Sequence, residues 1–292
     1  MQIWGVDFTS APRKAKPIAV ARARLQGDVL TVDAVEHLVD FAAFESFLAR
    51  PGPWVAGFDF PFTQARRFLD GIGWPIDWGS CMDLVGSLSR AEFRQRLENY
   101  KENRVVGDKE HQRLFEKGTG AASPQKLFGV PVGLMFFEGA PRLRAAGLHL
   151  PALHRGDRGR IAVEAYPGVA ARALLGRVSY KSDTKDAAGL LAARRALVAA
   201  LIGPAGQDRF GMRVMLPDGL DQDSAGDALD AALCAVQAAW AFRMGFCETG
   251  MPNLPEPCEG WIADPFVASR LGQAGLARPE PKRSAKAGPP QS

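Results

Sequence analysis

The sequence has few cysteines and histidines, and their spacing excludes several kinds of site. Its four cysteines, Cys81, Cys234, Cys247 and Cys258, form no CxxC pair and follow no repeat. This spacing argues against a structural zinc site and against a disulfide framework, and it favours a reducing cytoplasm. The four histidines also lack metal-ligand spacing. A site built on sulfur or imidazole ligands is therefore not expected.

Long apolar runs are missing as well. No run approaches the roughly 18–20 residues that a membrane-spanning helix needs. The N-terminal segment MQIWGVDFTS lacks the basic start and the apolar stretch of a signal peptide. We therefore expect no membrane segment and a cytoplasmic location. A GxxxxGK[ST] loop is also absent, which argues against a P-loop nucleotide site.

The composition that remains is that of a soluble protein with a large core. The chain has 292 residues, of which 47% are hydrophobic and 23% are charged, and this balance excludes global disorder. The formal net charge is +4, but most of it lies in the Pro- and Lys-rich residues 278–292. The charge therefore does not by itself indicate a nucleic-acid partner. We expect one domain over residues 1–277, followed by a disordered basic tail over residues 278–292.

The first sixty residues alternate between apolar segments and turns. Residues 3–8, 17–25 and 29–35 predict three strands that form a β-meander. Helical spacing over residues 41–49 predicts a helix, and the apolar residues 54–60 predict a fourth strand. The expected order is β-β-β-α-β, with an acidic residue at the exit of the first and fourth strands.

The remaining chain divides into an insertion and a second regular part. Residues 62–160 are interpreted as an insertion of helices and loops, in which residues 90–117 form a charged helix. Residues 161–165 predict a fifth strand, and residues 187–202 predict a helix. A long, strongly apolar helix is expected over residues 225–246, packed deeply on the sheet. The fold class is therefore α/β, with a mixed five-stranded sheet and helices on both faces.

Acidic residues stand where the predicted strands end and where the last helix begins. Asp7, Asp59 and Glu164 lie at or near the ends of buried strands, where an unpaired carboxylate is costly. Asp227 and Asp230 are three residues apart on a helix, so their side chains lie on the same side. If the first and fourth strands are parallel neighbours, these carboxylates share one small volume. Like charges at that density require a cation.

Hard oxygen ligands select Mg²⁺ or Mn²⁺. Two such ions about 3.5–4 Å apart can activate a water and stabilise the leaving oxygen in phosphodiester cleavage. Structural roles also remain open for these acids. Asp7 and Asp59 could be turn residues, Asp227 could belong to a helix cap that begins at Ser224, and Glu164 could pair with an arginine.

Four motifs, GVDFTSA, GFDFPF, VEAYPG and GDALDAALCA, resemble the family 429 of domains of unknown function (DUF429), described as predicted nucleases with a ribonuclease H-like fold. The closing part is also similar to RuvC-type Holliday-junction resolvases. The resemblance implies that Asp7 and Asp59 are the metal ligands of the first and fourth strands. It also implies that Asp227 and Asp230 are the pair on the final helix, and that Glu164 belongs to the EAYPG element.

The expected function is a nuclease of the ribonuclease H-like type that hydrolyses DNA or RNA with two Mg²⁺ or Mn²⁺ ions. The metal ligands would be Asp7, Asp59, Asp227 and Asp230, with Glu164 as a further catalytic candidate. Nucleic acid is the expected partner. The candidates for contacts to substrate phosphates are Arg90, Arg94, Arg104, Lys109, Lys181 and Lys185.

Two other functions remain open. An actin-like phosphotransferase begins with a similar strand and Asp, but its phosphate loop needs glycines, and residues 7–12 contain none. A non-catalytic member of the fold is the other alternative. Among the aromatic residues, the six tryptophans are most simply core residues, although Trp74 and Trp78 could stack on bases.

Overall fold

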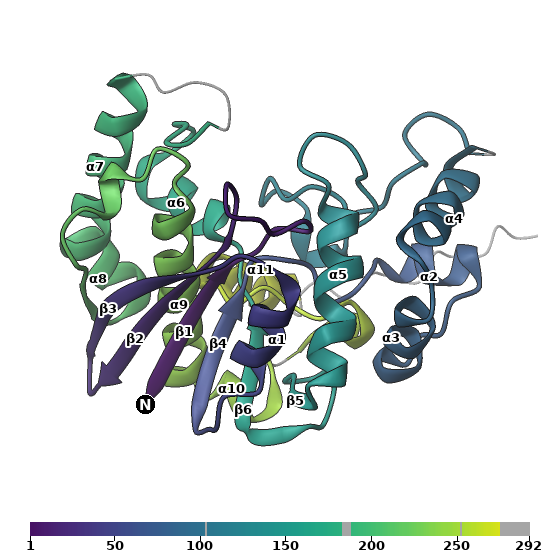
Figure 1. Cartoon of the computed structure of the whole chain (residues 1–292), viewed down its shortest axis with the longest axis horizontal. Coiled ribbons are helices and arrows are strands. Elements are labelled where there is room, and N and C mark those ends of the chain that lie inside the picture. The colour runs from purple at the N-terminus through teal and green to yellow at the C-terminus, as the bar shows by residue number, and fades with distance from the viewer. Residues whose placement is uncertain (103, 183–187, 252, 275–292) are drawn as a thin grey trace, which may run out of the picture.

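The computed structural model describes residues 1–102, 104–182, 188–251 and 253–274 (Figure 1). Within them, one mixed sheet has the strand order β5-β6-β4-β1-β2-β3-β7. The predicted tail (278–292) and Lys185 lie outside the described residues. The strands are β1 (Gln2–Asp7), β2 (Ile18–Gln26), β3 (Val29–Leu38), β4 (Trp54–Phe58), β5 (Leu148–His149), β6 (Asp157–Glu164) and β7 (Arg213–Met215).

Helices flank this sheet. They are α1 (Phe41–Leu48), α2 (Arg66–Ile72), α3 (Trp78–Gly86), α4 (Arg90–Glu102), α5 (Val132–Ala145), α6 (Pro167–Leu175), α7 (Ala188–Ile202), α8 (Pro204–Phe210), α9 (Asp227–Arg243), α10 (Phe246–Thr249) and α11 (Pro265–Ala274). In the described part of the chain, no single helix is long and apolar enough to cross a membrane. The bent pair of α7 and α8 reaches that length only when both are taken together.

The centre of the sheet has the element order β-β-β-α-β that the sequence predicted, and it meets the condition set for the acids, because the first and fourth strands are parallel neighbours. β1, β2 and β3 form an antiparallel meander, and the chain then crosses over through α1 to β4, which pairs with β1 in parallel. β6 pairs in parallel with β4 on its other side. The carboxyl ends of β1, β4 and β6 therefore lie at the same edge of the sheet.

Two expectations about secondary structure need correction. The described sheet has seven strands rather than five, because β5 and β7 add short edge strands of two and three residues. Segments this short leave no periodic pattern. The charged helix expected over residues 90–117 ends at Glu102. Gly107 has a φ of +90°, which does not continue an α-helix, and the later residues Leu114–Glu116 form a short 3-10 helix instead.

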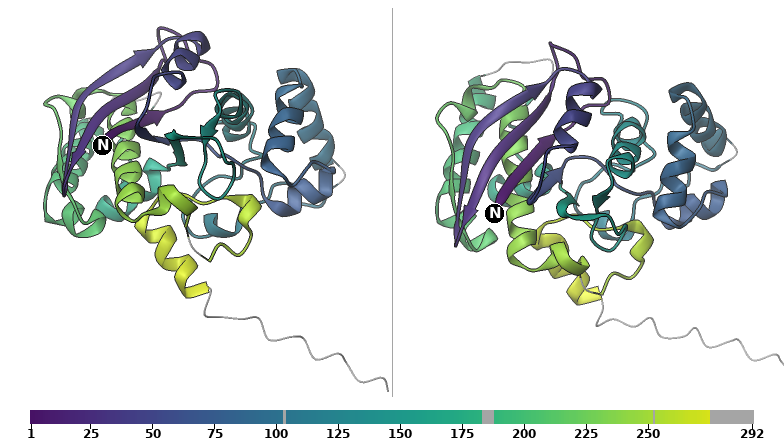
Figure 2. Two further views of the ribbon diagram at one scale, coloured as in Figure 1. Left: turned by 90° about the horizontal axis from the view of Figure 1, so that it is seen from below. Right: turned by 60° about the horizontal axis from the view of Figure 1, so that its bottom comes forward.

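The two faces of the sheet are covered by different parts of the chain. Ile3 and Val55 belong to a core with α6 to α9, whereas their neighbours Trp4 and Ala56 belong to a core with α1 to α5. This division follows from the alternation of side chains along a strand. Figures 1 and 2 show the two groups on opposite sides, with α2 to α5 in blue and teal and α6 to α9 in green.

α9 lies directly on β1 and β4 because the residues between them are small. A Cβ atom on Gly5 would lie 2.0 Å from the backbone oxygen of Ala231, and one on Gly57 would lie 2.4 Å from that of Cys234. No larger side chain fits at either position without moving the helix. The helix is buried from Ala228 to Ala241, and apart from Asp230 and Gln237 the buried residues of this stretch are apolar. Its first turn is thereby held against the carboxyl ends of the central strands.

Candidate active site at the carboxyl ends of the central strands

Three elements bring their acidic residues to one place. Asp7 ends β1, and Asp59 follows β4 directly, with its backbone N–H donating to the oxygen of Val6 at 2.9 Å. Each aspartate stands two residues after a glycine that contacts α9, so both side chains face that helix. Asp230 lies in the first turn of α9 and is only 1% exposed.

The electrostatics of these acids indicate that they share one volume. Burial raises the pKa of Asp7 well above its usual value; Lys181 opposes this rise, and Asp230, Asp59 and Asp227 add to it. Burial, opposed by Lys181 and reinforced by Asp230, raises the pKa of Asp59 to about 7. Burial also raises the pKa of Asp227. We call Asp7, Asp59, Asp227 and Asp230 the acid cluster.

Lys181 supplies positive charge to the acid cluster. Its ammonium donates to Oδ2 of Asp230, and the hydroxyl of Tyr180 donates to Oδ1 of the same carboxylate at 2.5 Å. Burial lowers the pKa of Lys181, but attraction to Asp230 and Asp7 outweighs that effect, so the pKa lies above its usual value. Lys181 therefore remains a cation among the acids.

The acid cluster suits a hard divalent cation by its donor chemistry. Among the described residues, the carboxylates of Asp7, Asp59 and Asp227 accept no hydrogen bond, so their lone pairs are free for a ligand. Carboxylate oxygens are the donors that Mg²⁺ and Mn²⁺ prefer. In the same part of the chain, however, no three His, Cys, Asp or Glu side chains are already arranged to hold an ion. The local positive charge comes from Lys181 instead.

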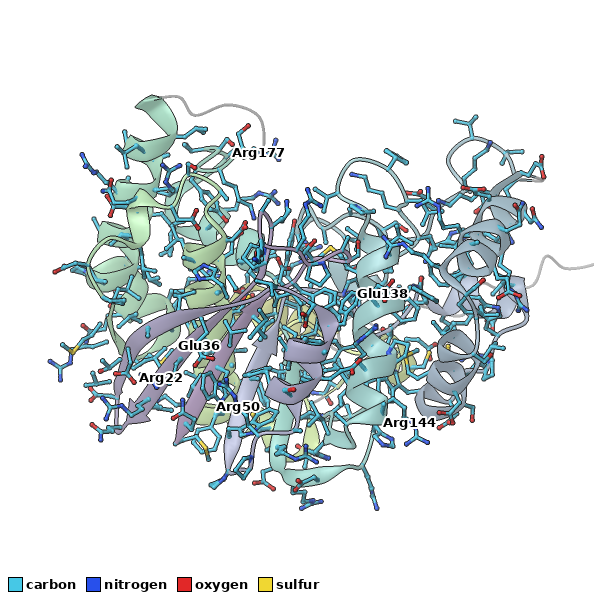
Figure 3. All side chains as sticks on the ribbon, viewed as in Figure 1. Arg22, Glu36, Arg50, Glu138, Arg144 and Arg177 are labelled. Atoms are coloured by element: carbon cyan, nitrogen blue, oxygen red, sulfur yellow. The ribbon has the colours of Figure 1, made fainter. Side chains whose placement is uncertain are left out.

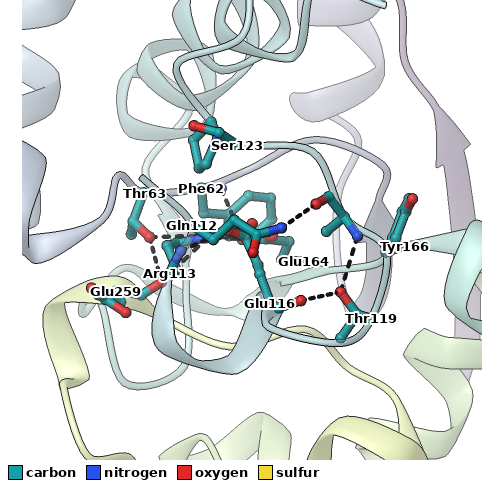
Figure 4. A network of polar contacts seen from close by, with 12 residues as sticks. Phe62, Thr63, Gln112, Arg113, Glu116, Thr119, Ser123, Glu164, Tyr166 and Glu259 are labelled. Carbon is teal, nitrogen blue, oxygen red and sulfur yellow. Dashed lines mark hydrogen bonds and ion pairs between the residues drawn. The ribbon is translucent and has the colours of Figure 1, made fainter. Parts of the chain in front are cut away.

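Glu164 is not among the free carboxylates. Along β6, Val163 faces α9 and Ala162 faces the opposite side, so alternation turns Glu164 away from the acid cluster. Arg113 donates to both of its oxygens, and the backbone N–H of Phe62 donates to Oε2 at 2.9 Å (Figure 4). The structure therefore shows the arginine pairing that the sequence left open for Glu164.

Arg113 is the centre of a buried polar network that links Glu164 at the end of β6 to Glu116 and to Glu259. Its side chain is 1% exposed and also pairs with Glu116, Nη2 to Oε1, at 2.7 Å. Glu259 accepts from the backbone N–H groups of Leu114 and Arg66, at 2.6 and 2.8 Å. We call Arg113, Glu116, Glu164 and Glu259 the arginine network. Burial still raises the pKa of Glu164, although Arg113 opposes the rise.

A cleft of about 930 Å³ opens onto both groups of charges. Asp59, Asp230 and Lys181 form part of its lining. One wall comes from residues 112–132, and the other comes from α6 and the residues after it up to Ser179. These walls carry three further basic residues, Lys126, Arg172 and Arg177.

The other predicted phosphate ligands lie elsewhere. Arg90 donates to Glu138 at 2.7 Å, and Arg104 donates to Asp108 at 2.6 Å. Arg94 and Lys109 lie on and beyond α4, and none of these four basic residues lines the cleft. Lys181 does line it. Figure 3 shows Glu138 on α5 and Arg177 on the opposite side, after α6.

One family model matches a long part of the chain that includes nearly all of the cleft lining. The model of the family "Protein of unknown function (DUF429)" matches residues 5–256. The chain belongs to the DUF429 family. The matched range contains the whole acid cluster, Lys181 and the insertion. The comparisons with curated proteins and with solved structures gave no significant match.

Sequence reasoning missed several residues that this DUF429 protein brings to the cleft. Tyr180 holds Asp230, and its position directly before Lys181 is the one signal that could have indicated it. Arg113 lies in a stretch expected to be helical, which hid its pairing with Glu164. The two tryptophans considered for base stacking, Trp74 and Trp78, are each 5% exposed and belong to the core.

Proposed function

We propose that this DUF429 protein is a metal-dependent nuclease of the ribonuclease H-like type that hydrolyses phosphodiester bonds in DNA or RNA in the cytoplasm. The observation that carries the proposal is the convergence of Asp7, Asp59 and Asp230 at one edge of the sheet. Acids gathered with so few hydrogen bonds are costly unless they serve to bind a cation.

The topology supports the same proposal. β1 and β4 are parallel neighbours, and α9 packs over both of them, so this topology brings the ends of all three elements to one edge of the sheet. Each of the three elements contributes one acid at the same end. A ribonuclease H-like fold would account for this arrangement of one acid each from β1, the end of β4 and α9.

Asp7, Asp59 and Asp230 would hold two Mg²⁺ or Mn²⁺ ions, with Asp227 completing the ligand set. When bound, such ions can supply an activated water and charge stabilisation at the leaving oxygen. The protein's own contributions are the orientation of the carboxylates and the binding of substrate phosphates. Tyr180 fixes the Asp230 carboxylate through Oδ1, and Lys181 offers a cation to a phosphate that approaches the acid cluster.

The test is a cleavage assay with labelled single-stranded and duplex DNA, RNA and DNA–RNA hybrids, in Mg²⁺, Mn²⁺ or EDTA. Asp7→Asn and Asp230→Asn should each reduce metal-dependent cleavage by at least about 10²-fold, because both the attacking and the leaving oxygen depend on the ions. Asp28→Asn is the matched control, since Asp28 is exposed in the turn between β2 and β3. It should cleave like the wild type.

Two outcomes would contradict the proposal. Equal cleavage by the wild type and Asp7→Asn would point to a contaminating nuclease. Nucleotide hydrolysis without cleavage of any nucleic acid would favour the phosphotransferase alternative instead. Circular dichroism of each variant in EDTA separates loss of activity from loss of fold.

A further inference from the structure

We propose that the cleft above the acid cluster binds single-stranded nucleic acid, with the backbone along its basic walls and the bases against an apolar rim. The inference rests on the proposed nuclease function and adds the class of substrate. It uses residues outside the acid cluster, so it can fail while the nuclease function stands.

The walls of the cleft carry cations that lack a carboxylate partner. Within the described residues, Lys126, Arg172 and Arg177 form no ion pair, whereas Arg90 and Arg104 outside the cleft are both paired. Unpaired cations above acidic residues are suited to a polyanion. They attract its phosphates, and they offset the repulsion between the phosphate to be cleaved and the carboxylates.

The rim beside these cations is apolar and exposed. Val130 and Val178 line the cleft and are 58% and 53% exposed, and Phe128, which is 67% exposed, lies outside the lining next to Lys126. The ammonium of Lys126 lies 5.2 Å from the centre of the Phe128 ring, so charge and aromatic surface occur together. A base can stack on such a ring only when it is unpaired and unstacked, because the base faces of a duplex are covered by their neighbours.

The size of the cleft also favours one strand. Its volume of about 930 Å³ is near the upper end of pockets that hold small ligands. The two walls are tied together where Arg172 donates to the oxygen of Thr119 and where Tyr166 donates to the oxygen of Gly120 at 3.3 Å. Gly120 has a φ of +79°, and a Cβ there would overlap the Arg172 guanidinium. These ties limit how far the walls can part for a double helix.

The experiment measures binding separately from cleavage. Fluorescence anisotropy in Ca²⁺, whose looser coordination positions reactants poorly, compares a labelled single strand with the duplex of the same sequence. The wild type should bind the single strand at least about tenfold more tightly. Phe128→Ala should weaken that binding by about tenfold, the size of one lost base–aromatic stack. Lys126→Ala and Arg177→Ala should each weaken it and reduce the salt dependence, by about 0.7 in log–log slope for each lost phosphate contact.

Val106→Ala and Arg158→Ala are the matched controls, because these side chains are 94% and 71% exposed away from the cleft; both should bind like the wild type. Equal binding of single strand and duplex, or full binding by Phe128→Ala and Lys126→Ala, would overturn the inference even if cleavage persists. Binding of free mononucleotides but not of a longer strand would also overturn it. Single-strand binding that depends on Phe128, without cleavage in Mg²⁺ or Mn²⁺, would uphold the inference and remove the nuclease proposal.

Discussion

The acid cluster and the arginine network lie beside the same cleft, but their carboxylates are compensated differently. In the arginine network, both oxygens of Glu164 accept hydrogen bonds, and Arg113 also pairs with Glu116. In the acid cluster, Asp230 is the one carboxylate that accepts hydrogen bonds from the residues the structure describes, and Lys181 is its ion-pair partner. The arginine network is fully buried, whereas Asp7, Asp59 and Asp227 are partly exposed, so the two groups differ both in their partners and in their contact with water.

This difference indicates different roles. A buried charge that is paired and fully hydrogen-bonded fixes one arrangement of the chain around it. Carboxylates left without hydrogen bonds destabilise the fold, and such destabilisation is typical of binding and catalytic sites. The arginine network therefore holds residues 112–116 against β6 and the segment before α11, while the acid cluster keeps carboxylate oxygens for the cation that we propose.

The largest expected effect comes from breaking the arginine network. Arg113→Met would leave the carboxylates of Glu116 and Glu164 buried without a cation, and we expect a loss of about 3–5 kcal/mol in the free energy of unfolding. Urea unfolding followed by circular dichroism measures it. Arg24→Met is the matched control, because Arg24 pairs with Asp33 on the surface and such pairs contribute about 0–1 kcal/mol.

Arg113→Lys keeps the positive charge but loses the bidentate contact with Glu164, so its stability should lie between those of the wild type and Arg113→Met. A loss below about 1 kcal/mol in Arg113→Met would show that the arginine network is not structural. Arg113 would then contribute no more to stability than a surface ion pair does.

The second expected effect concerns pH and the acid cluster without metal. The pKa of Asp59 is raised to about 7 in the folded protein, whereas an unfolded aspartate titrates near 3.9. Between these values the folded state binds a proton that the unfolded state has lost, so stability falls as the pH rises from about 4 to about 7. Above pH 7 the full penalty is present.

Asp59→Asn has no such proton to lose. Its advantage in unfolding free energy over the wild type, measured in EDTA, should grow by about 3 kcal/mol from pH 4 to pH 7 and then level off. Asp28→Asn, whose side chain is exposed, should show no such growth. An advantage for Asp59→Asn that is constant with pH would mean that Asp59 is already ionised and well compensated near pH 4.

The sequence predicts features that are encoded within one segment of the chain. It does not predict contacts between residues that are far apart in the sequence. Strands β1 to β4 and α9 were predicted because their apolar residues repeat along each segment, and the order of the elements then placed Asp7 and Asp59 at one edge. Gly5 and Gly57 gave no such signal, since their role is the close approach of α9, which appears only in the folded chain. The pairing of Glu164 with Arg113 joins residues 51 apart and leaves no local pattern.

The smallest expected effect tests whether Lys181 competes with a divalent cation for the acid cluster. Lys181→Met removes the ammonium from Asp230 and should lower the metal-free melting temperature, because the acids lose their cation. It should also bind Mg²⁺ or Mn²⁺ about tenfold more tightly. At saturating metal, a tenfold gain adds about 1.4 kcal/mol of stabilisation, or roughly 2–4 °C to the metal-induced rise in melting temperature for a chain of this size class.

Differential scanning fluorimetry over a metal titration measures this rise, and Asp7→Asn should reduce it because a ligand is lost. Arg195→Met is the control, since Arg195 pairs with Asp221 away from the cleft; its metal response should equal that of the wild type. A metal-induced rise in Lys181→Met that equals or falls below that of the wild type would mean that the lysine and the metal do not share the acids. The free carboxylates of the acid cluster would then have to be explained by the ammonium of Lys181 alone.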